Sequence, residues 1–242
     1  MDIVNWSKDE TVAIVTMNNG ENRHSPAWTK RMLQVFDEIT DDVEIKALVL
    51  AASDEKFWNL GIDTDWMTGI LERNDIKTLS EWFYENNKVF RFLLMCPFPS
   101  IAAITGHAFG NGIMLAGACD FRFMRSDKGF LCLPEIDLGI QLTPAMIEWM
   151  KRAIPYHLFI KMKWSGVRVG AAELEKHGVI IKACENSVDT VKSAVEFGKK
   201  FKKSRKTIAE MKIRTYKHII DKMEKEDPLY IDPPFFMLTP EN

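Results

Sequence analysis

The 242-residue chain has few cysteines and no strong excess of charge of either sign. Its four cysteines are far apart, and none forms a Cys-x-x-Cys pair: Cys96, Cys119, Cys132 and Cys184. This spacing favours reduced, packed thiols over a disulfide framework or a zinc site. A formal net charge of −2 at pH 7 gives no general attraction to nucleic acid or to an anionic membrane. An anionic partner must therefore be bound locally.

Long hydrophobic runs are also missing. No stretch reaches the roughly 18 apolar residues that a membrane-spanning helix requires. The opening residues, MDIVNWSKDETVAIV, lack a basic segment followed by an apolar one, and the closing MLTPEN is not a Ser-Lys-Leu type address. We therefore expect a cytoplasmic protein without a membrane or nucleic-acid partner. With 46% hydrophobic and 27% charged residues, the composition is that of a globular enzyme or binding protein.

Strand-like and helix-like segments alternate along most of the chain, which predicts the α/β class. Pro26 begins an amphipathic segment in which Trp28, Met32, Val35 and Ile39 recur at helical spacing. Apolar strands are predicted at residues 11–17, 45–52 and 96–105.

The last quarter of the chain has a helix-only pattern. We therefore divide the sequence into a core, residues 1–187, and a C-terminal helical segment, residues 188–242. The apolar residues of the second segment require another surface, either the core or a second subunit. No internal repeat or low-complexity tract is present.

Residues 104–120, ITGHAFGNGIMLAGACD, combine the end of an apolar strand with a Gly-Asn-Gly turn and a helix of small apolar residues. The free N–H groups at a helix start favour an anion or a developing oxyanion. Gly110 and Gly112 have no Cβ, so a substrate could approach their backbone closely. Alternatively, the glycines serve only helix packing. The spacing fits neither a dinucleotide fingerprint nor a P-loop.

A second glycine turn follows another strand, in FWNLGID, residues 57–63. The N–H after Gly61 belongs to Ile62. Two backbone donors from two separate turns can converge on one oxygen, which is how an oxyanion hole is built.

At this point the sequence resembles the crotonase superfamily, also called the enoyl-CoA hydratase/isomerase family. Four ordered motifs carry the resemblance, together with the early ENRHSP loop, and it extends over residues 10–182. The motifs are FWNLGID, GHAFGNGIMLAGACDFRFM, FLCLPEIDLGI and WSGVRVGAAELEKHGVI.

The resemblance implies a crotonase-type spiral of ββα units that binds an acyl-CoA thioester and stabilises its enolate. The two N–H donors are then those of Ile62 and Asn111, although Asn111 stands where the family usually has glycine. CoA is part of the substrate, and no metal or further cofactor is expected. The family's habit predicts a homotrimer or hexamer joined by the C-terminal segment. Substrate or CoA contacts are expected from Arg23, His24, Gly61, Asp63, Gly110 and Met114.

The catalytic carboxylates indicate the reaction. Hydratases of the family use two glutamates; here the first position is Met114 and the second is Glu135. One carboxylate beside an oxyanion hole suits a proton shuttle, as in the family's Δ3,Δ2-enoyl-CoA isomerases. Thr143 stands where dienoyl-CoA isomerases and 4-chlorobenzoyl-CoA dehalogenases have aspartate, which disfavours both activities.

Other readings of these residues stay open. The chain could instead be a thioester hydrolase, a decarboxylase or a non-catalytic acyl-CoA-binding protein. Met114 is either a core residue or part of the acyl pocket, and Asp63 could fix a turn. Arg23 and His24 could lie in a solvated loop without a CoA contact.

Overall fold

The computed structural model describes residues 2–232 and confirms the α/β class. Within these residues nine strands form two sheets, in the orders β1-β2-β3-β5-β7-β9 and β4-β6-β8. Only the β1–β2 pair is antiparallel among the pairings of the described strands. The strands are β1 (Val4–Asp9), β2 (Val12–Met17), β3 (Ala47–Ala52), β4 (Phe57–Asn59), β5 (Ser100–Ile104), β6 (His107–Phe109), β7 (Phe121–Arg125), β8 (Leu131–Cys132) and β9 (Lys182–Cys184).

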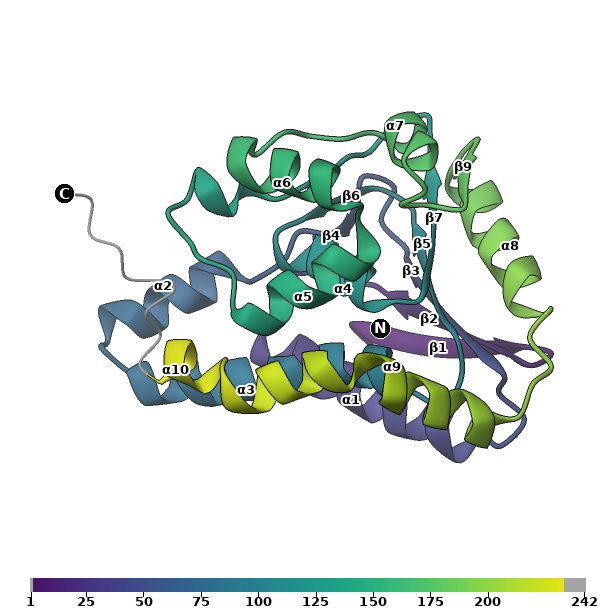
Figure 1. Ribbon diagram of the computed structural model, residues 1–242, viewed down its shortest axis with the longest axis horizontal. Coiled ribbons are helices and arrows are strands. Elements are labelled where there is room, and N and C mark those ends of the chain that lie inside the picture. Colours follow the sequence, from purple (N-terminus) through teal and green to yellow (C-terminus); the bar gives the residue numbers. More distant parts are fainter. Residues whose placement is uncertain (1, 233–242) are drawn as a thin grey trace.

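Helices connect and cover these strands (Figure 1). They are α1 (Pro26–Asp41), α2 (Thr64–Glu72), α3 (Ile76–Met95), α4 (Asn111–Ala118), α5 (Pro144–Ala153), α6 (Tyr156–Ser165), α7 (Ala171–Lys176), α8 (Ser187–Gly198), α9 (Arg205–Lys225) and α10 (Pro228–Ile231), with a 3₁₀ turn η1 (Pro134–Ile136). None of these described helices has a stretch long and apolar enough to cross a membrane.

The chain forms the predicted spiral of ββα units. Three successive turns place one strand in the large sheet and the next in the small sheet: β3 and β4, β5 and β6, β7 and β8. β4 and β6 pair in parallel, with Asn59 opposite Ala108. Parallel strands end on the same side, so the turn after Asn59 meets the turn after Phe109. This pairing brings the two predicted donor turns together.

The predicted helix at Pro26 is confirmed, and local chemistry explains its start. The Ser25 hydroxyl caps α1 by accepting from the Trp28 N–H at 3.3 Å, and Pro26 occupies the first turn, where no N–H is needed. The four apolar residues with helical spacing are all fully buried. Sequence patterns missed the three-residue strands β4 and β6, because such short segments show too little alternation. They also missed β1, in which Val4 is the one buried residue.

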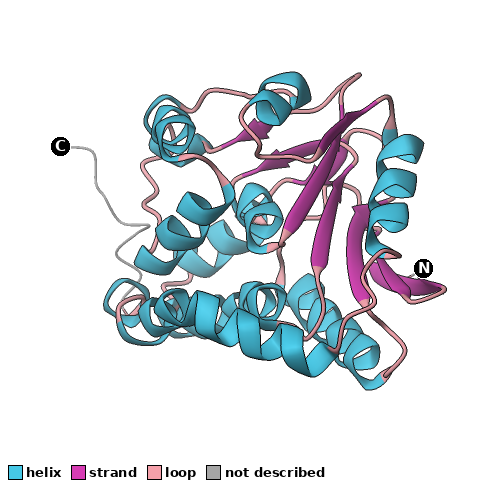
Figure 2. Cartoon of the chain, turned by 45° about the vertical axis from the view of Figure 1, so that its right-hand side comes forward, coloured by secondary structure: helices cyan, strands magenta, loops and turns pink. Residues whose placement is uncertain are grey.

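The large sheet lies between two helical layers (Figure 2). One face packs against α8, through Val12, Ala47, Ile101, Ala194 and Val195. The other face packs against α1, α3, α4 and α5 in the main core. The four cysteines are free and buried in these layers, as predicted.

The C-terminal segment packs on the core of its own chain. α8, which begins at the predicted boundary, covers the sheet, and α9 lies against α3 and α5. Several apolar side chains of this segment stay exposed: Val188, Met211, Ile213, Leu229 and Tyr230. Its role between subunits stays a prediction, and residues 233–242 of it lie outside the described chain.

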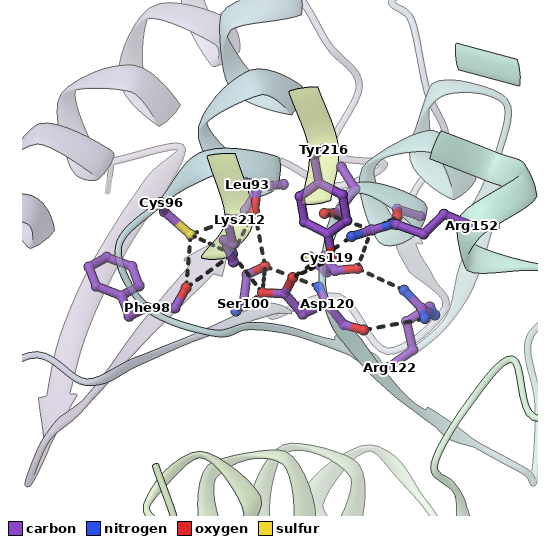
Figure 3. Close-up of polar contacts among 12 residues, drawn as sticks. Leu93, Cys96, Phe98, Ser100, Cys119, Asp120, Arg122, Arg152, Lys212 and Tyr216 are labelled. Carbon is purple, nitrogen blue, oxygen red and sulfur yellow. Dashed lines mark hydrogen bonds and ion pairs between the residues drawn. The ribbon is translucent and has the colours of Figure 1, made fainter. Parts of the chain in front are cut away.

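A buried ion pair fastens α9 to the core (Figure 3). The Lys212 ammonium lies 2.7 Å from the Asp120 carboxylate and also donates to the carbonyl oxygens of Leu93 and Phe98 at 3.2 and 3.1 Å. Asp120 in turn accepts from the Ser100 N–H at 2.8 Å. The pair therefore joins α9 to the start of β5 and the end of α4.

Two arginines cover the C-terminal end of α4 in the same cluster (Figure 3). Arg122 and Arg152 each donate to the Cys119 carbonyl at 2.8 Å, and Arg152 also donates to the Ala118 carbonyl at 3.1 Å. Cations at this end complement the helix dipole. The N-terminal end of α4, at Asn111, is the end at which the sequence predicts the oxyanion to bind.

Lys212→Met is expected to lower the free energy of unfolding by about 3 kcal/mol, because it removes the closer of the two cations that face the largely buried Asp120 carboxylate and leaves only Arg152, at 3.8 Å. Lys217→Met is the matched control, since Lys217 lies on the same helix and pairs with Asp221 at the surface; its cost should stay below about 1 kcal/mol. Urea unfolding followed by circular dichroism measures both. Equal losses in the two variants would contradict the anchoring role.

Candidate active site

A cavity of about 310 Å³ opens at the N-terminal end of α4. Its walls come from residues 60–67, from α3, from residues 109–111 and 134–146, and from α10. Most of the lining side chains are apolar, with a few polar groups among them, which is the usual character of a small-molecule site. Of the site residues predicted from the sequence, the cavity brings together Arg23, Ile62, Gly110, Asn111 and Glu135.

The two predicted oxyanion donors lie side by side. A Cβ built on Gly61 would be only 2.8 Å from the Asn111 nitrogen, so the backbones of the two turns are in direct contact. Gly61 has a φ of +82°, a conformation that favours glycine. Within the described residues, neither the Ile62 nor the Asn111 N–H has a hydrogen-bond acceptor. Both residues line the cavity, so the structure places the two predicted donors at the same cavity.

Asn59 and His24 hold the Gly61 turn in place. The Gly61 N–H donates to the Asn59 side-chain oxygen at 2.9 Å. The His24 N–H donates to the Gly61 carbonyl at 2.7 Å, and the Asp63 N–H donates to the His24 carbonyl at 3.0 Å. The turn is therefore preorganised by hydrogen bonds on both sides of Ile62.

The glycines of the Gly-Asn-Gly turn have different tasks. A Cβ on Gly112 would lie 2.0 Å from the Asn59 carbonyl oxygen, so this glycine lets α4 sit directly on the end of β4. A Cβ on Gly110 would meet the Glu135 carboxylate at 3.5 Å. Gly112 thus serves packing, whereas Gly110 lies beside the carboxylate in the cavity.

Glu135 is the one carboxylate among the described residues that line this cavity. It lies in η1 after Pro134, and its Oε2 is buried without a hydrogen-bond partner in the described chain. Burial away from water raises the pKa of Glu135 to about 7. A carboxyl group with this pKa can both accept and return a proton near neutral pH.

The His24 ring does not reach the cavity, which corrects the expected side-chain contact with CoA. The ring is fully buried and stacks on Trp28 with a centroid distance of 3.9 Å. Burial lowers the pKa of His24 to about 3, so the ring is neutral. Its backbone supports the donor turn instead. Arg23 does line the cavity; it pairs with Glu21 at 2.6 Å and donates to the Ile62 carbonyl at 3.2 Å. Its contact with CoA stays a prediction.

Asp63 and Met114 also differ from the expected substrate contacts. The Asp63 carboxylate caps α2 by accepting from the Trp66 N–H at 3.1 Å, so it fixes a turn. Met114 is fully buried in the main core and does not line the cavity. The position at which a hydratase would have its first glutamate is therefore filled by a core side chain.

The sequence predicts that residues 80–92 line the acyl pocket, and Phe83 and Asn87 of this segment do line the cavity, whereas the contributions of Met67 and Ile231 were not predicted. These four residues belong to α2, α3 and α10. Met67 and Ile231 are 164 positions apart in the sequence. Sequence patterns indicate which segments are apolar and buried, but not which of their residues meet in space.

Comparisons with known proteins agree with this geometry. A sequence model described as enoyl-CoA hydratase/isomerase matches residues 7–241. The chain belongs to this family. The solved structures reported below share its crotonase fold.

Named relatives include both reaction types. The chain is 30% identical over 184 residues to a short-chain-enoyl-CoA hydratase of Clostridium acetobutylicum, covering 74% of this chain and 68% of the relative. It is 25% identical to the peroxisomal enoyl-CoA delta isomerase 2 of Arabidopsis thaliana, covering 75% and 77%.

Longer relatives and solved structures extend this picture. The chain is 28% identical to the fatty acid oxidation complex subunit alpha of Shewanella frigidimarina, covering 86% of this chain but 29% of that protein's length. An enoyl-CoA hydratase/isomerase family protein from Pseudomonas syringae superposes with a TM-score of 0.85 at 20% identity, covering 96% and 97% of the two chains. This likeness shows the fold.

Proposed function

We propose that the chain is a Δ3,Δ2-enoyl-CoA isomerase, which moves the double bond of a 3-enoyl-CoA into conjugation with the thioester. One observation carries the proposal: among residues 2–232, Glu135 is the one carboxylate that lines the cavity, and it lies there with Ile62 and Asn111, whose N–H groups have no acceptor in this part of the chain. Met114, in the position of the hydratases' other glutamate, lies in the core. The likeness to enoyl-CoA delta isomerases supports the same reaction.

The proposed mechanism requires one base and one oxyanion hole. The Glu135 carboxylate removes a proton from C2, and the electron pair moves onto the thioester oxygen. The Ile62 and Asn111 N–H groups stabilise that oxygen in the dienolate. The protonated Glu135 then returns its proton to C4 while the electrons form the C2–C3 double bond. The glutamate ends as it began, and the product is an isomer of the substrate.

The direct test is to add 3-enoyl-CoA to the purified protein and to follow the ultraviolet absorbance of the conjugated 2-enoyl thioester. A rise in absorbance with no change in mass is the expected result. A hydratase would instead add water to 2-enoyl-CoA, which raises the product mass, and a thioester hydrolase would release free CoA thiol. Either of these products without isomerisation would contradict the proposal, as would binding of CoA esters without turnover.

The pH dependence of the reaction follows from the raised pKa of Glu135. Because the base acts as a carboxylate, kcat/KM should fall about tenfold for each pH unit below the pKa of about 7 and level off above it. Initial rates at about pH 5 to 9 measure this profile. A flat profile down to about pH 5 would indicate an ordinary glutamate and contradict the proposed role of burial.

The expected assembly follows from the family resemblance, and the expected location follows from the sequence composition and its lack of a recognisable address. A homotrimer or hexamer and a cytoplasmic location both stay predictions.

A further inference from the structure

The four-residue helix α10 closes one end of the active-site cavity. Its last residue, Ile231, is 1% exposed and packs in an apolar cluster with Met67 and Phe83. All three side chains line the cavity. This apolar end belongs to the same cavity as Glu135 and the two oxyanion donors, so an acyl chain bound with its thioester at those donors can extend toward it.

The preceding residue of α10 lies on a different cavity. Tyr230 lines a second cavity of about 540 Å³, together with Trp164 and Lys163. Glu135 and residues 140–142 line both cavities, and residues 140–142 form the part of the wall between them that lies beside α10. α10 and this wall therefore separate the catalytic cavity from further apolar space.

The start of α10 is fixed to the wall by a buried carboxylate. Asp227 is fully buried, and its two oxygens accept from the Thr143 hydroxyl and from the Ala145 N–H, both at 2.9 Å. Thr143 follows the wall directly and caps α5. Burial raises the pKa of Asp227 to about 6, as expected for a carboxylate kept from water.

The end of α10 is fixed to α3. The Ser80 hydroxyl donates to the Ile231 carbonyl at 2.8 Å, and the Tyr84 hydroxyl donates to the Asp232 carboxylate. Hydrogen bonds at both ends thus hold Ile231 between α3 and the wall. A helix of four residues has little stability of its own, so these contacts determine its position.

We propose that Ile231 is a chain-length stop that restricts the substrate to short- and medium-chain acyl groups, and that Asp227 is the positioning residue that holds this stop. The inference rests on the proposed function only in requiring an acyl-CoA ligand. Each methylene added to the acyl chain strengthens binding by about fourfold while it is buried. Once the chain reaches Ile231, further methylenes find no space, and affinity stops rising.

Binding of saturated acyl-CoAs of increasing length, measured by isothermal titration calorimetry on the full chain, tests the stop. Saturated esters cannot be isomerised, so the result does not depend on turnover. The wild-type affinity should rise with acyl-chain length up to a certain length and then stop rising. We call this limiting length the break. In Ile231→Ala the break should shift by one to two methylenes, and the first ester beyond the wild-type break should bind about four- to fifteenfold more tightly.

Asp227→Ala should move the break in the same direction, and Asp227→Asn, which keeps one acceptor oxygen, should move it less. Leu229→Ala is the matched control, because Leu229 lies on the same helix, is 67% exposed and does not line the cavity; its break should stay at the wild-type length. Thermal unfolding of each variant distinguishes a shifted break from general destabilisation, which would weaken the binding of all esters equally.

An affinity that rises without a break to long chains in the wild type, or an unmoved break in Ile231→Ala, would overturn the inference. Loss of the isomerase activity alone would not, because the break is measured by binding. Conversely, isomerisation with an unmoved break would leave the proposed function intact and remove only the chain-length stop.

Discussion

Glu135→Gln is expected to lower kcat for 3-enoyl-CoA by about 10³- to 10⁴-fold. An amide of the same shape cannot accept the C2 proton, and positioned acid–base groups contribute up to about four orders of magnitude to a rate. The fold should survive, because the substitution removes a buried carboxylate whose Oε2 has no partner in the described chain. Absorbance of the conjugated product measures the rate, and calorimetry with a saturated acyl-CoA checks that binding stays within about threefold.

Asp137→Asn provides the matched control for this prediction. Asp137 lies two residues further along, is exposed and does not line the cavity. We expect its kcat to stay within about twofold of the wild type. If Glu135→Gln kept full activity, Glu135 would not be the proton shuttle; if Asp137→Asn lost as much, the catalytic acid would have been misassigned.

Gly61→Ala is expected to lower kcat by about 10²- to 10³-fold. The new Cβ would lie 2.8 Å from the Asn111 nitrogen and 2.9 Å from the Phe109 carbonyl oxygen, both backbone atoms, so the two turns must separate. Loss of one oxyanion donor typically costs this factor. The reaction barrier should rise more than the affinity for saturated esters falls, because the hydrogen bonds to the oxyanion strengthen in the transition state.

Gly178→Ala controls for the backbone strain in that variant. Gly178 also has a positive φ, +68°, but a Cβ there would meet nothing within 4 Å. It should lose about 1 kcal/mol of stability from strain and keep its kcat. Single-turnover rates and urea unfolding distinguish the two effects. Equal kcat values for both variants would show that close contact of the two turns is not required for catalysis.

The sequence alone identified those site residues whose signal lies in a short local segment. Glycine is favoured at residue 61, where φ is +82°, and at residue 110, where φ is +56°. Glu135 was found because Pro134 and the residues around it form a recognisable motif. Each of these signals is contained in a few adjacent residues, so a single sequence can carry it.

Side-chain direction could not be predicted in the same way. His24 and Arg23 are neighbours in one loop, yet Arg23 lines the cavity and His24 stacks on Trp28. Met114 could have pointed to the core or to the acyl pocket, and it packs in the core. Asp63 caps a helix that the sequence pattern did not reveal. These outcomes depend on which surfaces meet across the fold.

The sequence by itself determined the α/β class and the family, and it predicted the two donor turns and Glu135 as the catalytic carboxylate. The tertiary structure decided that β4 and β6 pair, which places Ile62 beside Asn111, and that Ile231 closes a cavity whose other residues lie far away in the chain. The physical reason is that backbone conformation is set mainly by adjacent residues, whereas burial and cavity shape are set by packing between distant ones.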